Sequence, residues 1–230
     1  MKRLGLLIIL GLFLSGCVST DNYYEYVYRK QSEGAIIRPD TIHPYIQFKA
    51  DKLPQTDTLV QVKKVRTLFI PALLYWQWEG TKKCELNARK YADVFFAKFQ
   101  FYADSLDLKP QLNGQRLEIT MENIPHCFFY MEKGYIVFLF YTSITNDLEA
   151  IYPQREELGF SYRLYSGDVV TQSGFIEIER FDEFMENQSW STKKFTWQYL
   201  EQYEQSIVDL SKAAVERLIT QLKLAEAKKE

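Results

Sequence analysis

The central part of the chain alternates apolar and polar residues with the two-residue period of β-strands. The run LVQVKKVRTLFI, residues 59–70, is rich in β-branched residues and predicts a first core strand. After Pro71 the run ALLYWQWEG continues this strand, with Trp76 and Trp78 on one side of it. The run LEITME, which begins at Leu117, alternates without a break. Alternation of this kind predicts strands that bury one face.

Two other stretches carry apolar residues at the spacing of a helix. Residues 82–105 place Cys84, Phe95 and further apolar side chains on one face, which predicts a well-buried helix. A second stretch extends from about Phe195 to Leu224 and is followed by a charged tail. The chain is therefore predicted to have one helix after its first strand and another at its C-terminal end.

Turn signals divide the region between these helices. MEKG, residues 131–134, predicts a turn that leads into the strand YIVFLFYTSI, residues 135–144, and a polar loop around Pro153 follows. SGD, residues 166–168, predicts the turn of a hairpin. We therefore expect a meander of antiparallel strands in this region.

The predicted order indicates an α+β fold with an antiparallel sheet of about four to six strands and two helices packed on one face. We assign this single domain to residues 59–230. Residues 17–58 contain several prolines and lack clear periodicity, so we interpret them as a lead-in that lies over the domain. In this lead-in, Tyr24, Tyr26 and Tyr28 share one side of an extended chain. They favour a short edge strand, with an aromatic ligand platform as the alternative.

The N-terminus has the layout of an export signal. A basic pair precedes an apolar run that is shorter than the roughly 20 residues needed to span a bilayer. The motif LSGC that follows, Leu14 to Cys17, resembles the lipobox of bacterial lipoproteins. This resemblance implies that residues 1–16 are removed and that Cys17 carries lipid, whose several acyl chains would hold the protein firmly on a membrane. A plain secretory signal or a short membrane anchor is the alternative.

The resemblance also implies a location in the bacterial cell envelope. Val18 stands where many inner-membrane lipoproteins of enteric bacteria have Asp, so we expect the outer membrane and its periplasmic side, with surface exposure as the alternative. The element order over residues 59–224 resembles that of lipopolysaccharide-assembly lipoproteins and of auxiliary lipoproteins of ABC-type lipid transport systems. This likeness of fold implies a protein partner in the envelope, but it carries over no functional residue.

Removal of the signal would change the net charge with which the protein meets its partners. The remaining 214 of 230 residues carry 26 basic and 30 acidic side chains, because Lys2 and Arg3 are lost with the signal. A weakly acidic chain without a basic block provides no electrostatic basis for binding nucleic acid. The aromatic content of 16% favours strands and an aromatic-rich surface.

Two cysteines remain once Cys17 carries lipid. Cys84 and Cys127 form a possible disulfide, because an exported compartment permits one. The closed loop would stabilise the fold by about 4 kcal/mol in the chain-entropy model. Two alternatives are buried free cysteines and a thiol of lowered pKa at Cys84, which follows two lysines at the predicted helix start.

Residues with the potential for catalysis or metal binding are few. The sequence contains no GxSxG elbow, phosphate-binding loop, dinucleotide fingerprint, HExxH or EF-hand motif. His126 precedes Cys127, and neighbouring residues on a strand point to opposite faces, so the pair predicts no metal site. Glu177 and Glu179 alternate with isoleucines, which indicates the solvent face of a strand rather than a glycosidase pair. We predict no catalytic residue, metal ligand or cofactor.

The predicted strand over residues 135–144 supplies the main candidate for binding. If Ile136 and Phe138 face the helices, an apolar stripe lies on the other face, unless the lead-in covers it. With two tryptophans, this stripe makes up the candidate partner or ligand surface: Trp76, Trp78, Tyr135, Val137, Leu139 and Tyr141. The sequence therefore predicts a non-catalytic lipoprotein with a binding or accessory role, such as a part in an outer-membrane transport or assembly complex. Glycan or lipid binding on the aromatics is the alternative, and a carboxylate hydrolase comes third.

Overall fold

The computed structural model describes most of the chain between residues 19 and 227. The described ranges are 19–33, 43–55, 57–139, 142–179, 184–189 and 191–227. Cys17, the predicted lipid site, and Tyr141, one of the predicted surface residues, lie outside these ranges. Within them, no helix combines the length and the apolar character needed to cross a membrane.

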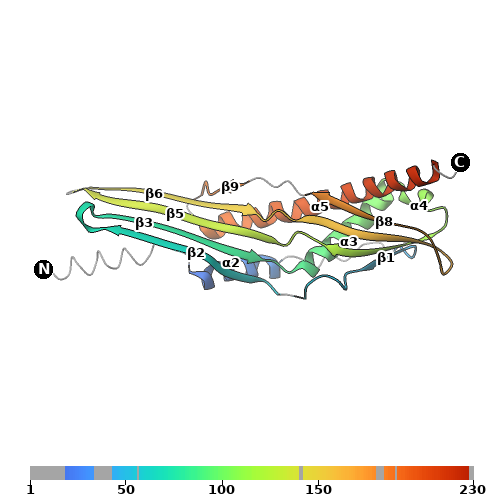
Figure 1. Cartoon of the computed structure of the whole chain (residues 1–230), viewed down its shortest axis with the longest axis horizontal. Helices are drawn as coiled ribbons and strands as arrows, with labels where there is room; N and C mark the ends of the chain where they lie inside the picture. Colours follow the sequence, from blue (N-terminus) through green and yellow to red (C-terminus); the bar gives the residue numbers. More distant parts are fainter. Residues whose placement is uncertain are drawn as a thin grey trace.

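The fold is α+β and contains two sheets (Figure 1). The mixed four-stranded sheet has the order β1-β4-β7-β8, with β1 at Ile46–Lys49, β4 at Arg116–Asn123, β7 at Glu157–Ser166 and β8 at Val169–Glu179. The antiparallel five-stranded sheet has the order β2-β3-β5-β6-β9, with β2 at Leu59–Ile70, β3 at Tyr75–Glu85, β5 at Cys127–Leu139, β6 at Thr142–Pro153 and β9 at Met185–Glu186. The helices are α2 at Thr20–Glu33, α3 at Ala88–Ser105, the short α4 at Leu108–Gln111 and α5 at Thr192–Ala227, and a 3₁₀ turn, η1, occupies Pro71–Leu73.

One hydrophobic core joins the sheets and the helices. The long helix α5 contacts α2 and α3, and it also contacts β6 of one sheet and β8 of the other. In this core, the rings of Phe95 and Phe99 of α3 lie 6.0 and 6.3 Å from the ring of Phe160 of β7. The predicted α+β class is confirmed, but two sheets replace the single predicted sheet. Hydrophobic alternation reports which face of a strand is buried, and it does not report which strands pair.

The lead-in contains a helix where the tyrosines predict an edge strand. On α2, Tyr23 and Val27 lie four residues apart, and both side chains are fully buried. Tyr24 and Tyr28 lie on the outer side of the helix, with ring centroids 5.6 Å apart. The edge-strand prediction is therefore wrong, because the four-residue spacing of these pairs outweighs the alternation of the tyrosines. The strand β1 also belongs to this segment, and its Ile46 is buried in the core.

The first predicted helix begins later than its apolar pattern indicates. Residues 82–85 belong to β3, and α3 starts at Ala88. The side-chain oxygen of Asn87 caps this start by accepting a hydrogen bond from the backbone N–H of Lys90 at 3.1 Å. Cys84 therefore lies on a strand and not on a helix. A buried strand that passes directly into a buried helix leaves no polar break in the sequence to mark the boundary.

The predicted turn at MEKG is wrong, because these residues lie inside β5. Gly134 pairs with Trp78 of β3, and a Cβ atom on Gly134 would lie 2.5 Å from the Trp78 ring. The glycine makes room for an indole ring and does not form a turn. The strands β5 and β6 pair in antiparallel fashion as far as Leu139 and Thr142. The predicted strand over 135–144 is thus divided, and because β6 extends to Pro153, the predicted loop is reduced to residues 154–156.

Three other predictions are confirmed. The strand β2 coincides with residues 59–70, and α5 includes the whole predicted C-terminal helix. The hairpin of β7 and β8 turns at Gly167, which has a positive φ of 61°. In β4, Leu117, Ile119 and Met121 are buried, as the alternation predicts.

Candidate functional site

Two short links join the two sheets, and they lie next to each other. Residues 124–126 lead from β4 into β5, and residues 154–156 lead from β6 into β7. Because β4 pairs with β7 and β5 pairs with β6, both links pass between the sheets at the same place. They bring His126, Cys127 and Glu156 together, so that one ligand-type atom from each lies within 4.8 Å of the other two. We call these three residues the junction cluster.

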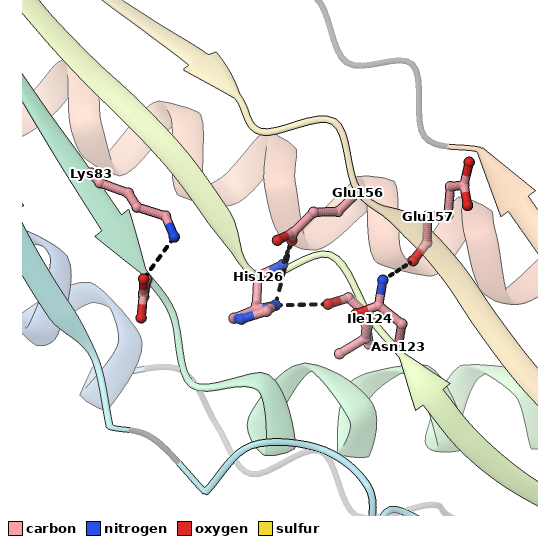
Figure 2. Close-up of polar contacts among 7 residues, drawn as sticks. Lys83, Asn123, Ile124, His126, Glu156 and Glu157 are labelled. Atoms are coloured by element: carbon pink, nitrogen blue, oxygen red, sulfur yellow. Dashed lines mark hydrogen bonds and ion pairs between the residues drawn. The ribbon is translucent and has the colours of Figure 1, made fainter. Parts of the chain in front are cut away.

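His126 and Glu156 make two contacts with each other (Figure 2). The backbone N–H of His126 donates a hydrogen bond to Glu156 Oε2 at 2.7 Å, and His126 Nδ1 lies 3.4 Å from the same oxygen. The ring nitrogen Nδ1 also lies 3.0 Å from the carbonyl oxygen of Ile124, which orients the ring. A further hydrogen bond, from the Asn123 side chain to the Glu157 carbonyl at 2.8 Å, ties β4 to β7 beside the cluster. The junction is therefore held by side chains as well as by strand pairing.

The charges of the junction cluster depend on one another. A hydrogen bond with Cys127, followed by the contacts with Glu156, raises the pKa of His126 to about 10. Burial opposes ionisation of Glu156, but hydrogen bonds from His126 outweigh burial and lower the pKa of this carboxyl. Lys83 Nζ lies 2.8 Å from Glu85, and this hydrogen bond raises the pKa of the lysine. At neutral pH His126 is therefore an imidazolium and Glu156 a carboxylate.

Sequence reasoning missed the junction cluster because it treated His126 and Cys127 as neighbours on one strand. The strand β5 begins at Cys127, so His126 belongs to the irregular link, where strand alternation does not apply. Glu156 comes from another link, 30 residues further along the chain, and no spacing motif relates it to the other two. The one signal in the sequence is Pro125, because a proline interrupts strand pairing and marks a break before His126.

The two thiols described by the structure do not pair. Cys84 and Cys127 are both free and buried. The register of β3 and β5 places Cys84 opposite Phe128 and Cys127 opposite Glu85, so the two side chains point to opposite faces of the sheet. Burial raises the pKa of Cys84 above the ordinary thiol value, so the hypothesis of a lowered pKa at this residue is wrong. Of the three hypotheses for these cysteines, buried free thiols describe the structure.

A second candidate site is the end of the five-stranded sheet where β2, β3, β5 and β6 turn. One row of paired residues crosses these strands: Val65, Gly80, Glu132 and Glu149. Both long helices that contact this sheet start at the row. Thr20 of α2 lines a pocket together with Val65 and Gly80, and the Thr192 hydroxyl of α5 donates a hydrogen bond to Glu149 at 2.7 Å.

Beyond this row the strands continue past α2 and α5 without helical cover from the described part of the chain (Figure 1). From Val65 to Ile70 the uncovered strand β2 measures about 17 Å, at about 3.3 Å per residue. The helix α2 runs away from this region, because Gln31 near its end accepts a hydrogen bond from the hydroxyl of Thr58, the residue before β2. We call the uncovered part, with residues 67–78 and the described residues of 134–146, the free end of the sheet.

The sequence of the free end carries no charge, and it combines apolar residues with uncharged polar ones, which are most frequent on β6. Residues 67–78 and 134–146 contain no Asp, Glu, Lys or Arg. Its exposed large apolar side chains are Leu68, Phe69, Leu73, Leu74, Leu139 and Ile144. Leu73, in the turn between β2 and β3, is 63% exposed. Four charged residues lie directly behind the uncharged part, two of them basic and two acidic: Arg66, Glu79, Lys133 and Asp147. Contiguous exposed apolar surface of this kind is typical of interaction sites.

The described residues of the predicted binding surface all belong to the free end, but they lie on its two opposite faces. Trp76 and Trp78 share the face of Cys84, which the helices cover further along the sheet. Tyr135, Val137 and Leu139 lie on the other face. The structure therefore does not bring the predicted set together as one aromatic platform. The charge-free stretches on both sides of the two turns are the sequence signal that identifies the whole free end.

A buried ion pair lies at the base of the free end. Lys82 Nζ is 2.7 Å from Glu132 Oε1, and both side chains are 6% exposed. The Tyr130 hydroxyl donates to the second carboxylate oxygen of Glu132 at 3.3 Å. Burial, followed by the negative charge of Glu132, raises the pKa of Tyr130. A pocket of about 190 Å³ opens between this pair and the start of α2. The pair thus lies where the covered part of the sheet ends.

The glutamates of β8 lie on its solvent face. Glu177 and Glu179 are exposed, whereas Ile176 and Ile178 are buried, which confirms the interpretation of this strand as half-buried. Glu157 of β7 lies close to Glu177, and their hydrogen bond and mutual repulsion raise the pKa of Glu157. These carboxylates are open to water.

Comparisons of the chain with protein-family models, with curated proteins and with solved structures find no match. The likeness to lipopolysaccharide-assembly and lipid-transport lipoproteins therefore rests on the element order predicted from the sequence.

Proposed function

We propose that this protein is a lipid-anchored envelope protein with a binding or accessory role, and that its free end docks into the surface of the membrane that holds the lipid. The observation that carries the proposal is the uncharged, exposed apolar end of the five-stranded sheet. Transfer of apolar side chains from water into an acyl layer lowers the free energy. Half-exposed leucine and phenylalanine side chains would each contribute about 1 kcal/mol, which is half of the transfer value for a full side chain.

The start of α2 supports this orientation. Ser19, the first described residue, lines the pocket beside Val65 and Gly80, at the base of the free end. The predicted lipid site, Cys17, is two residues earlier in the chain. Two residues span at most about 7 Å, so lipid on Cys17 would enter the membrane near the base of the free end. One membrane surface can then accommodate both the lipid and the apolar turns.

The order of side chains along the free end matches the layers of a membrane surface. The apolar residues Leu73 and Leu74 lie at the turn, and Trp76 follows close behind them. The charged residues Arg66, Glu79, Lys133 and Asp147 lie further back, at the level of the polar headgroups. Tryptophan is enriched at the boundary between acyl chains and headgroups.

Unpaired backbone limits the depth of insertion. Among the described residues, no strand pairs with the outer edge of β2, and β9 pairs with β6 only at Ala150 and Ile151. Unsatisfied N–H and C=O groups cost several kcal/mol each in hydrocarbon. The proposed docking is therefore interfacial, with the turns entering about 5–10 Å, as for other interfacial elements. The rest of the surface stays available for the expected protein partner, such as a component of a transport or assembly complex.

A fluorescent probe on the free end tests this proposal. A Leu73→Cys variant would be labelled with an environment-sensitive fluorophore, because the native Cys84 and Cys127 are buried and should not react. The lipidated protein would be reconstituted into vesicles of phosphatidylethanolamine and phosphatidylglycerol. We expect a blue shift of the emission, and quenching by nitroxide groups attached to the lipid acyl chains.

The matched control is Val169→Cys, at the turn between β7 and β8. Val169 is 68% exposed, close to the value for Leu73, but it lies in the other sheet. We expect its probe to report water and to escape quenching from the acyl chains. A Leu73 probe that stays in water would overturn the proposal. A blue shift without acyl-chain quenching would also overturn it, because it would indicate that protein covers the free end.

A further inference from the structure

The junction cluster contains the donor atoms of a metal site. His126 provides an imidazole nitrogen, Cys127 a thiol sulfur and Glu156 a carboxylate oxygen. Zinc in proteins takes these donor types, and sites with three protein ligands keep the fourth position for water. We propose that His126, Cys127 and Glu156 bind a zinc ion, or a similar divalent transition-metal ion, with water as the fourth ligand.

The spacing of the cluster is close to that of a tetrahedral site. Metal–ligand distances of about 2.0–2.3 Å at tetrahedral angles separate neighbouring ligand atoms by roughly 3.3–3.7 Å. His126 Nδ1 and Glu156 Oε2 already lie 3.4 Å apart. All three ligand-type atoms lie within 4.8 Å of one another, so closing the site shortens no distance between two ligand atoms by more than about 1.5 Å. Side-chain rotation can supply a shift of this size, and it would also move His126 Nδ1 away from the Ile124 carbonyl oxygen, which an unprotonated nitrogen cannot keep as a hydrogen-bond partner.

The charges also suit a divalent ion. A Cys127 thiolate and the Glu156 carboxylate carry two negative charges, which an ion of charge +2 balances. The ion would displace the thiol proton and the imidazolium proton, and both would pass to water. In the metal-free protein the imidazolium of His126 balances Glu156 instead. Lys83 adds no net charge nearby, because it is paired with Glu85.

The position of the cluster gives the ion a clear role. His126 and Cys127 lie where β4 passes into β5, and Glu156 lies where β6 passes into β7. A bound ion would therefore connect the two links and fix one sheet relative to the other. Cys127 is 3% exposed, so the sulfur is reached from within the junction and not from the open surface. This role is independent of the proposed membrane docking.

Cobalt titration tests the proposal directly. The full-length protein, purified in detergent and stripped with a chelator, would be titrated with Co²⁺ alone. We expect one Co²⁺ per chain and the near-ultraviolet absorption band of a thiolate bound to cobalt, and we expect Zn²⁺ to abolish this band. His126→Ala and Glu156→Gln should weaken binding at least about a hundredfold, since even loss of an outer-shell partner costs ten- to a hundredfold.

The cysteine variants assign the sulfur ligand. Cys127→Ser should abolish the thiolate band, and the matched control Cys84→Ala removes the other buried thiol and should retain it. Wild-type protein without a thiolate band would overturn the proposal, as would a band that survives Cys127→Ser or disappears with Cys84→Ala. Circular dichroism checks that each variant is folded. If Cys127→Ser does not fold, the wild-type spectrum and the Glu156→Gln titration still decide the question.

Discussion

The buried pair Lys82–Glu132 allows a quantitative test of how the base of the free end is built. Lys82→Met and Glu132→Gln each preserve the shape of the side chain and leave the other charge buried without its partner ion. Both side chains are 6% exposed, so water reaches them only through the adjoining pocket and replaces the lost partner poorly. Breaking such a pair costs about 3–5 kcal/mol, against a total unfolding free energy of about 5–15 kcal/mol for a domain. We therefore expect each single variant to lose about 3 kcal/mol or more.

The double variant Lys82→Met/Glu132→Gln separates a buried charge from a lost contact. It buries no charge, so we expect it to be more stable than either single variant. Equilibrium unfolding in urea would measure all four proteins. As a control, Glu216→Gln breaks the exposed contact between Lys212 and Glu216 on α5, and it should change the stability by less than about 0.5 kcal/mol. If the double variant loses as much stability as the two single variants together, the reasoning is refuted, because neither charge is then desolvated in the folded protein.

Three further predictions follow from particular contacts. Gly134→Ala should destabilise the protein by about 1–3 kcal/mol in urea unfolding, because its Cβ would lie 2.5 Å from Trp78 and 2.6 Å from the Asn146 carbonyl oxygen. An unchanged stability of this variant would contradict the assignment of MEKG to a strand. The His126 contribution to stability in chelator should be complete below pH 6.5 and decline as the pH rises towards 10, because the folded state raises the pKa of this group to about 10. His126→Asn should therefore flatten the fall in urea midpoint over this range, and an unchanged profile would argue against the charged pair with Glu156. Cys84 should not react with a thiol reagent in the native protein, since it is fully buried and burial raises its pKa, and rapid labelling at this residue would contradict its place in the core.

The pattern of apolar and polar residues correctly predicted the elements that have one buried and one exposed face. Leu117, Ile119 and Met121 are buried on β4, and the β7–β8 hairpin turns at the predicted glycine. These elements follow from the two-residue period and from turn chemistry. The pattern failed at Gly134 and at the start of α3, because there the structure depends on neighbours distant in sequence. The sequence alone does not distinguish a glycine that makes room for an indole ring from a glycine that forms a turn.

The candidate sites required the three-dimensional pairing. Trp76 and Tyr135 were predicted as surface residues, and both belong to the free end, but only the register shows that they lie on opposite faces. The junction cluster joins His126 to Glu156 through two links that become neighbours only when the sheets form. No local period in the sequence encodes that contact.

Quenching of single tryptophans by brominated lipid tests the central claim, that the free end docks into the membrane. One variant would retain only Trp76, at the free end, and the other only Trp197, whose Nε1 donates a hydrogen bond to the Tyr26 carbonyl of α2 at 2.9 Å. Both lipidated proteins would be reconstituted into vesicles whose lipids carry bromine on the acyl chains. We predict strong quenching of Trp76 and none of Trp197. Equal fluorescence of Trp76 in brominated and ordinary lipid would contradict membrane docking by the free end.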